Sequence, residues 1–261
     1  MHDLSVTAGL LRKDRWVVVA GMAAITALAW AYMLSLATGM QAAGAMDTMV
    51  AAQVDPWRPA DIWMTFTMWA IMMVAMMLPS AAPLILLFAT LQSKRSTPAS
   101  PLPDTGLFAT GYIAVWTLFS AAATLLQWAL HSTALLSPML VSTSPLLGGA
   151  LLIAAGIYQW TRLKQACLTH CRSPLEFLSR HWRSGHDGAF IMGMHHGWYC
   201  VGCCSMLMLL LFVLGVMNLL WVATLALIVL IEKVAPAGRW LARCGGLVLV
   251  AWGVESILTT W

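Results

Sequence analysis

Residues 63–91 have the sequence WMTFTMWAIMMVAMMLPSAAPLILLFATL, which contains no charged side chain. This stretch exceeds the roughly 20 apolar residues that a helix needs to cross a hydrocarbon core about 30 Å thick. The whole chain shows the same bias, because 61% of its residues are hydrophobic and only 9% are charged. Soluble domains carry about 25% charged residues. The composition therefore excludes an ordinary soluble protein and predicts an all-α, polytopic membrane helical bundle.

Seven apolar segments are candidate membrane spans. The first is too long for the apolar region of a typical signal peptide, so we expect an uncleaved anchor. Residues 215–218 predict a tight turn, because one tilted helix over 196–231 would be too long for a single crossing. We expect one integral membrane domain, residues 1–261, with about seven spans near 16–38, 63–91, 106–130, 145–161, 196–214, 218–231 and 241–260.

The distribution of basic residues predicts the orientation of the bundle. Lys and Arg collect on the cytoplasmic side of membrane proteins. With a cytoplasmic N-terminus and seven crossings, Arg58 is the one basic residue of the 14 that falls outside. Six crossings would also place Lys233, Arg239 and Arg243 outside. The charge pattern therefore independently favours the turn at residues 215–218.

The densest group of potential metal ligands is the sequence HHGWYCVGCC at residues 195–204. Thiolates and imidazoles bind soft metals such as Cu(I), and also Zn(II). Cysteine is also a small core residue, but His195 and its neighbour have no reason to stand on a lipid-facing surface. At about 100° per residue, four members of the group share one helix face: His196, Cys200, Cys203 and Cys204.

A second group of thiols precedes the first in the chain. Cys167 and Cys171 are one helical turn apart, and Pro174 ends their helix soon afterwards. Both groups fall on the inner side of the expected topology, so up to five thiols can surround one site. The reducing cytosol keeps such thiols available as ligands. Cys244 stands alone near the last span, where packing is the simpler interpretation.

Methionines form a stripe along the outer half of the span at 63–91. Thioethers bind Cu(I) without losing a proton, although methionine is also a flexible core filler. Because the stripe is expected across the membrane from the thiols, we consider a metal relay along this helix. Pro79 and Pro83 predict a kink in it. The candidate ligands of the stripe are Met72, Met73, Met76 and Met77.

Four further ionisable residues lie in or beside the spans, where such groups are functional candidates. Glu255 lies inside the last span, and His131 lies at the outer end of the third. Glu232 stands beside Lys233 at the inner membrane edge, where we expect an ion pair. The sequence assigns no chemistry to Glu255 or His131.

Five short motifs are distributed along the chain: MMLP at 76–79, KQACLTHCRSP at 164–174, GWYCVGCC at 197–204, GVMN at 215–218 and EK at 232–233. Together they resemble a bacterial family of predicted metal-binding integral membrane proteins of unknown function, also labelled copper-chaperone-like. The resemblance extends from about residue 60 to 235 and implies a metal-binding protein of the bacterial inner membrane.

The favoured function is the handling of Cu(I) by a carrier or chaperone. Copper would enter along the methionine stripe, bind the thiols, and pass to a cytoplasmic acceptor or a membrane cuproenzyme. Zn(II) fits the thiols equally well, and the methionine stripe is what favours copper. The chain has no Gly-rich nucleotide-binding motif and no charge pattern typical of nucleic-acid binding. Its expected surroundings are the lipid bilayer and a metal-accepting protein.

Two other classes of function stay open. Cys200 and Cys203 have the spacing of a dithiol redox centre, which suggests a membrane thiol-disulfide oxidoreductase. Such a centre should face an oxidising compartment, whereas the charge pattern places these thiols inside. A structural or assembly subunit of a membrane complex is the third interpretation.

Overall fold

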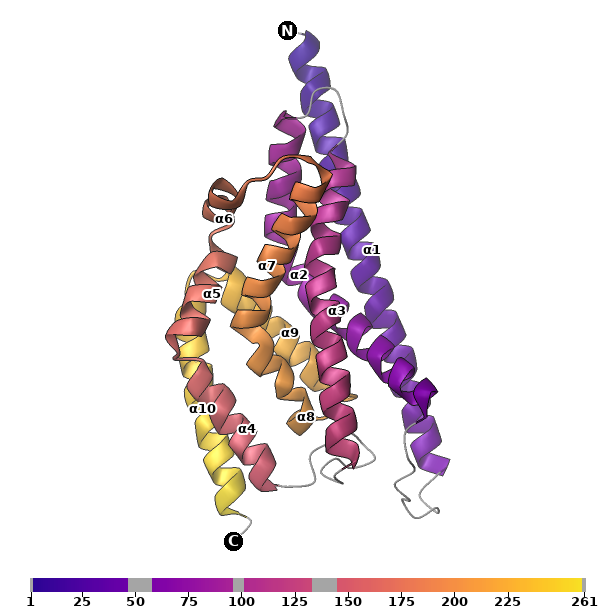
Figure 1. The fold of residues 1–261 in the computed structure, drawn as a ribbon, viewed down its shortest axis with the longest axis vertical. Coiled ribbons are helices and arrows are strands. Elements are labelled where there is room, and N and C mark those ends of the chain that lie inside the picture. Colours follow the sequence, from indigo (N-terminus) through magenta and orange to yellow (C-terminus); the bar gives the residue numbers. More distant parts are fainter. Residues whose placement is uncertain (1, 47–57, 96–100, 133–144, 260–261) are drawn as a thin grey trace.

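The computed structural model describes residues 2–46, 58–95, 101–132 and 145–259. Within these ranges the chain is helical and contains no strand, which confirms the all-α class. Figure 1 shows the long helices running along one common direction, with the start of α1 and the end of α10 at opposite ends of the bundle. Residue 260, the expected end of the last span, lies outside the described residues.

The helices of the described ranges are named here in chain order. They are α1 (His2–Met46), α2 (Pro59–Arg95), α3 (Leu102–Ser132), α4 (Pro145–Tyr158), α5 (Arg162–Arg172), α6 (Pro174–His181), α7 (Gly185–Leu209), α8 (Leu211–Leu214), α9 (Leu219–Val234) and α10 (Gly238–Leu258).

Within the part of the chain that the structure describes, five segments are long and apolar enough to cross a membrane. Helix α4, with 14 residues, and helix α9, with 16 residues, fall short of the about 20 residues that a crossing needs. A count of seven spans depends on these two helices and stays a prediction. The five longer segments are Asp14–Gly39, Pro59–Ser93, Leu102–Ser132, Gly185–Leu214 and Gly238–Leu258.

Two glycines with positive φ delimit the segment that carries the cysteines. Gly185 (φ 84°) starts α7 well before residue 196, where the span was expected to begin. Gly215 (φ 92°) ends α8, and the side chain of Asn218 then caps α9 by accepting a hydrogen bond from the Leu220 N–H at 3.2 Å. The predicted turn at residues 215–218 is therefore confirmed. The earlier start of α7 moves the cysteines from a helix end to its middle.

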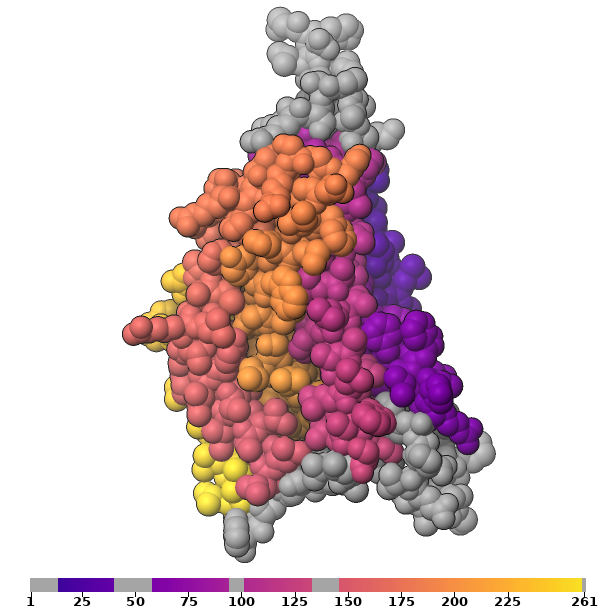
Figure 2. Space-filling model, in the orientation of Figure 1, coloured from indigo at the N-terminus to yellow at the C-terminus, as the bar shows by residue number. Residues whose placement is uncertain are grey.

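Helix α7 packs in the centre of the bundle between α3 and α5. In Figure 2, α7 (orange) is visible between α5 (salmon) and α3 (magenta). Glycines permit the close approach to α3: a Cβ at Gly111 would lie 2.2 Å from the Phe190 carbonyl oxygen, and a Cβ at Gly193 would lie 2.0 Å from that of Phe108. Small residues at such crossings let membrane helices pack backbone to backbone.

Helix α4 pairs with α10 in the same way. A Cβ at Gly156 would lie 2.7 Å from the Gly246 carbonyl oxygen, and one at Gly253 would lie 2.7 Å from that of Gly149. Helix α4 ends at Tyr158, and α5 begins a few residues later at Arg162. From there Tyr158 donates a hydrogen bond to the Gly202 carbonyl of α7 at 2.5 Å.

A buried ion pair joins α5 to α9. The Lys164 ammonium contacts a Glu232 carboxylate oxygen at 2.7 Å and also donates to the Gln159 side chain. The side chains of Lys164 and Glu232 are 0% and 3% exposed, so the charges are enclosed in the bundle. The sequence analysis had expected Glu232 to pair with Lys233 at the membrane edge. That expectation was wrong, because helical spacing turns neighbouring residues toward different partners.

The close crossing of α3 and α7 predicts the effect of one added methyl group. We expect Gly111→Ala to lower the free energy of unfolding by about 1–3 kcal/mol, because the new Cβ meets backbone that cannot move aside. Gly106→Ala in the same helix is the matched control, since a Cβ there meets nothing within 4 Å. Unfolding of the purified protein in detergent measures both. Equal stability of the two variants would contradict the close approach of α3 and α7 at Gly111.

The buried ion pair predicts that losing one partner destabilises the protein more than losing both. We expect Lys164→Met to cost about 3–5 kcal/mol of stability, because it leaves the Glu232 carboxylate buried without its counter-charge. Adding Glu232→Leu should recover most of this loss, since apolar replacement of a whole buried pair is often nearly neutral. The same unfolding measurement applies. A double variant as unstable as the single one would show that the lost charge pairing is not the cause.

Candidate metal centre

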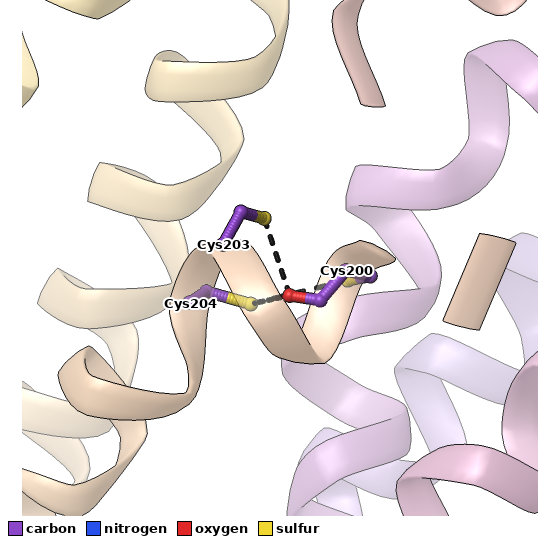
Figure 3. Close-up of side chains that lie close together, drawn as sticks. All are labelled: Cys200, Cys203 and Cys204. Carbon is purple, nitrogen blue, oxygen red and sulfur yellow. Dashed lines mark hydrogen bonds between the residues drawn. The ribbon is translucent and has the colours of Figure 1, made fainter. Parts of the chain in front are cut away.

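Three thiols gather on the buried face of α7. Cys200, Cys203 and Cys204 are 0%, 2% and 1% exposed, and their sulfur atoms lie within 4.8 Å of one another. The Sγ atoms of Cys200 and Cys204 are 3.9 Å apart. As Figure 3 shows, the thiols of Cys203 and Cys204 both point to the Cys200 carbonyl oxygen, at 3.2 and 2.8 Å. The three cysteines share one helix face, as their spacing predicted, and form a group that can hold a metal ion.

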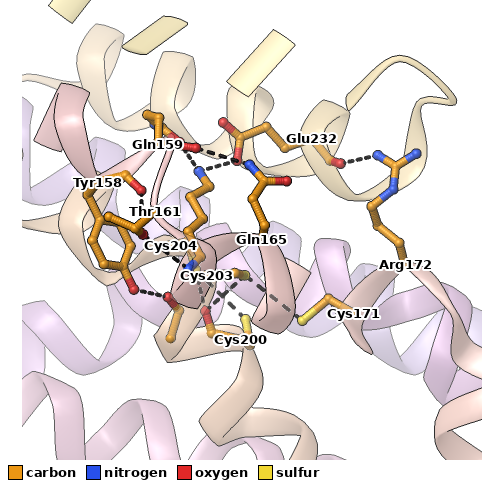
Figure 4. Close-up of polar contacts among 12 residues, drawn as sticks. Tyr158, Gln159, Thr161, Gln165, Cys171, Arg172, Cys200, Cys203, Cys204 and Glu232 are labelled. Atoms are coloured by element: carbon orange, nitrogen blue, oxygen red, sulfur yellow. Dashed lines mark hydrogen bonds and ion pairs between the residues drawn. The ribbon is translucent and has the colours of Figure 1, made fainter. Parts of the chain in front are cut away.

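Two neighbouring helices add one sulfur each to this group. Helix α5 contributes Cys171, whose Sγ lies 3.9 Å from that of Cys203 (Figure 4). Helix α2 contributes Met77, whose Sδ lies 3.9 Å from the Sγ of Cys204. We call Cys171, Cys200, Cys203, Cys204 and Met77 the sulfur cluster. Two sulfurs bound to one ion at about 2.3 Å lie roughly 3.8–4.0 Å apart in tetrahedral or trigonal geometry, so these spacings fit a shared metal.

Cys167 lies beside the sulfur cluster on α5. A Cβ at Gly202 would be 2.6 Å from the Cys167 sulfur, so a glycine at that position lets α5 approach α7. Burial raises the pKa of the Cys167 thiol, and the nearby Cys203 raises it further. The pKa of Cys171 is raised well above its usual range by its hydrogen bond with Cys203 and by burial. A metal that binds these thiols must therefore displace their protons.

Two polar side chains contact the Cys200 sulfur. The Lys233 ammonium lies 2.8 Å from it and the Tyr112 hydroxyl 3.0 Å from it. Lys233 also donates to the Ser80 hydroxyl at 2.9 Å, while Ser80 and Tyr112 both donate to the Met77 carbonyl, at 2.8 and 3.2 Å. Sequence reasoning did not include Tyr112 or Ser80 in the site. It counted Lys233 among the functional candidates but paired it with Glu232 at the membrane edge.

The adjacent histidines have different surroundings. His196 is buried, and its ring stacks on that of Tyr112 with the centroids 5.5 Å apart. Its Nδ1 has no hydrogen-bond partner among the described residues. His195 is exposed and lines a surface pocket with Arg180 and His181. The structure therefore directs His196 into the bundle beside Tyr112, while His195 faces the surface.

The methionine stripe is closer to the thiols than expected. Met72, Met73 and Met76 are buried in α2 with Met77, and Met77 contacts Cys204 directly. The expectation that the two groups are far apart was wrong for Met77, because the cysteines lie near the middle of the apolar segment Gly185–Leu214. Both groups meet near Pro79, within the helix that was expected to bend.

Comparison with known proteins identifies a family for the chain. No curated protein and no solved structure matches the chain significantly. A family model described as PpoB2, copper chaperone, matches residues 66–255. The matched range contains every member of the sulfur cluster as well as Cys167 and Lys233, and it confirms the resemblance drawn from the sequence motifs. The chain belongs to the PpoB2 copper chaperone family.

Proposed function

We propose that this protein is a carrier or chaperone for Cu(I) in the bacterial inner membrane. It would receive copper within the bundle and pass it to a cytoplasmic acceptor or a membrane cuproenzyme. The observation that carries this proposal is the sulfur cluster, in which thiols from α5 and α7 and a thioether from α2 lie side by side. A set of sulfur donors is the one that soft Cu(I) prefers.

The donor set favours copper over zinc through Met77. Zn(II) sites in proteins are built from thiolate, imidazole and carboxylate ligands, whereas a thioether is a ligand for Cu(I). The four thiols of the cluster fit either ion. Membership in a copper chaperone family agrees with the choice of copper.

The proposed topology has seven crossings with the N-terminus in the cytoplasm. In its support, α1, α2, α3, α4, α7, α9 and α10 alternate in direction along the bundle in Figure 1. An odd number of crossings also agrees with the start of α1 and the end of α10 lying at opposite ends. The short α4 and α9 would each cross beside longer helices, so that protein surrounds much of their length.

A route for the ion follows from the same contacts. Met72, Met73 and Met76 lead along α2 to Met77, which contacts the thiols, and α5 lies on the other side of the cluster. We propose that Cys167 exchanges metal with the cluster and that His196 supplies an imidazole one helical turn from Cys200. His195, exposed beside Arg180, would be the first contact for an acceptor protein.

Burial argues against the alternative of a thiol-disulfide oxidoreductase. A redox dithiol must offer a thiolate to attack a substrate disulfide, whereas the side chains of Cys200 and Cys203 are 0% and 2% exposed. A structural or assembly subunit would need none of these sulfur contacts. It would instead be recognised by a stable partner that stays bound during purification.

One prediction of the proposed function concerns metal content. We expect the wild-type protein, purified in detergent and loaded with Cu(I) under anaerobic conditions, to retain the ion with sulfur ligation visible by X-ray absorption. The variant Cys200→Ser/Cys203→Ser/Cys204→Ser should lose at least about 90% of this copper, because hydroxyls are poor ligands for a soft cation. Cys244→Ser is the control, since that cysteine is exposed on α10. Equal copper in wild type and triple variant would refute the site.

A second prediction separates the thioether from the thiols. Met77→Leu keeps the size and apolar character of the side chain but removes its sulfur. We expect about tenfold weaker Cu(I) binding and unchanged Zn(II) binding, measured by competition with chelators of known affinity. Met68→Leu, also buried in α2, should change neither. A Met77→Leu variant with wild-type Cu(I) affinity and loading rate would exclude Met77 as a ligand and as the end of the proposed route.

A further inference from the structure

Lys233 is a buried cation whose charge is not matched by a carboxylate in direct contact. Its side chain is 7% exposed, and its ammonium contacts the Ser80 hydroxyl and the Cys200 sulfur. Among the ion pairs found within the described residues, none includes Lys233. The neighbouring carboxylate, Glu232, is instead paired with Lys164 at 2.7 Å. The nearest groups that can compensate Lys233 are therefore the thiols of the sulfur cluster.

The position of the Lys233 ammonium is fixed by a ring of polar contacts, which we call the polar circuit. The Lys233 ammonium contacts the Cys200 sulfur and the Ser80 hydroxyl. The Ser80 hydroxyl donates to the Met77 carbonyl. The Tyr112 hydroxyl contacts both that carbonyl and the Cys200 sulfur. The circuit links α9, α2, α3 and α7. An unpaired charge in the interior is costly, so a lysine held in this way must be compensated by the anion that the cluster provides.

A metal held by buried thiolates needs such a cation. Two thiolates and one Cu(I) carry a net charge of −1, and the same two thiolates with Zn(II) are neutral. For any given set of thiolates, the copper complex is one charge more negative than the zinc complex. A fixed ammonium in contact with one of these sulfurs therefore stabilises the copper complex more than the zinc complex.

We propose that Lys233 is the specificity-determining residue of the site and that its positive charge selects a monovalent over a divalent metal. The inference rests on the proposed function, because it requires the sulfur cluster to bind metal. One unit charge at about 5 Å, in an effective dielectric constant of about 20, changes the ratio of the two affinities on the order of a hundredfold. The cost of ionising the thiols cancels from this ratio when both metals displace the same protons.

The experiment measures Cu(I) and Zn(II) affinities by chelator competition on the full chain in detergent, at one pH and without oxygen. In Lys233→Met the ratio of Cu(I) to Zn(II) affinity should fall on the order of a hundredfold. In Lys233→Arg, which keeps the charge, it should stay within about threefold of wild type. Unfolding of each variant in detergent shows whether it is folded.

A second pair of variants tests the charge without removing the lysine. Ser80→Asp places a carboxylate where the hydroxyl lies 2.9 Å from the ammonium, so the charge of Lys233 is neutralised in place. The ratio of Cu(I) to Zn(II) affinity should fall as it does in Lys233→Met. Ser80→Asn is the matched control, because it has similar size without charge, and the ratio should be retained.

The outcomes separate this inference from the proposed function. Binding of both metals with the same ratio in wild type, Lys233→Met and Ser80→Asp would overturn the role of Lys233 while leaving the metal site standing. A wild-type protein that binds neither metal would overturn the proposed function and the inference with it. A fall of the ratio in both neutralised variants, with retention in Lys233→Arg and Ser80→Asn, is the result that we expect.

Discussion

The Lys233 ammonium lies in the interior of the helix bundle, 2.8 Å from the Cys200 sulfur. Its side chain is only 7% exposed, so the polar groups around it have to be satisfied mainly by other parts of the chain. Ser80 and Tyr112 meet this requirement by joining Lys233 and Cys200 to the Met77 carbonyl. The same contacts place Met77 beside Cys204, so the polar circuit and the sulfur cluster share Met77 and Cys200 and depend on each other.

The long-range architecture of the chain could be predicted because it depends on local properties. The uncharged stretch at 63–91 forms α2, and the turn at residues 215–218 separates α8 from α9, as expected. The shared face of Cys200, Cys203 and Cys204 follows from helical spacing alone. Each of these features is determined by residues within a few turns of one another, and a single sequence contains that information.

The contacts between elements could not be predicted in the same way. No sequence pattern pairs Glu232 with Lys164, since the two residues lie on different helices and Lys233 was the nearer partner along the chain. The start of α7 was set too late, because residues 185–195 include glycine and charged or polar side chains that hide the helix from a hydropathy pattern. That error also separated Met77 from the thiols that it contacts.

The burial of the sulfurs suggests how a tightly held ion can still be transferred. Met77, Cys204 and Cys203 lie deep in the bundle, whereas Cys171 and Cys167 are partly exposed on α5. The sulfurs of Met77 and Cys204, of Cys204 and Cys200, and of Cys203 and Cys171 lie 3.9 Å apart. At these distances an incoming thiol can bind before the outgoing one leaves, so the ion need not be released into an apolar interior. Because the pKa of Cys171 is raised, its free thiol keeps its proton, and a metal that binds there must displace it. In the proposed chaperone, the arrival of copper at Cys171 would therefore release a proton and its departure would take one up, while Lys233 stays in place beside Cys200.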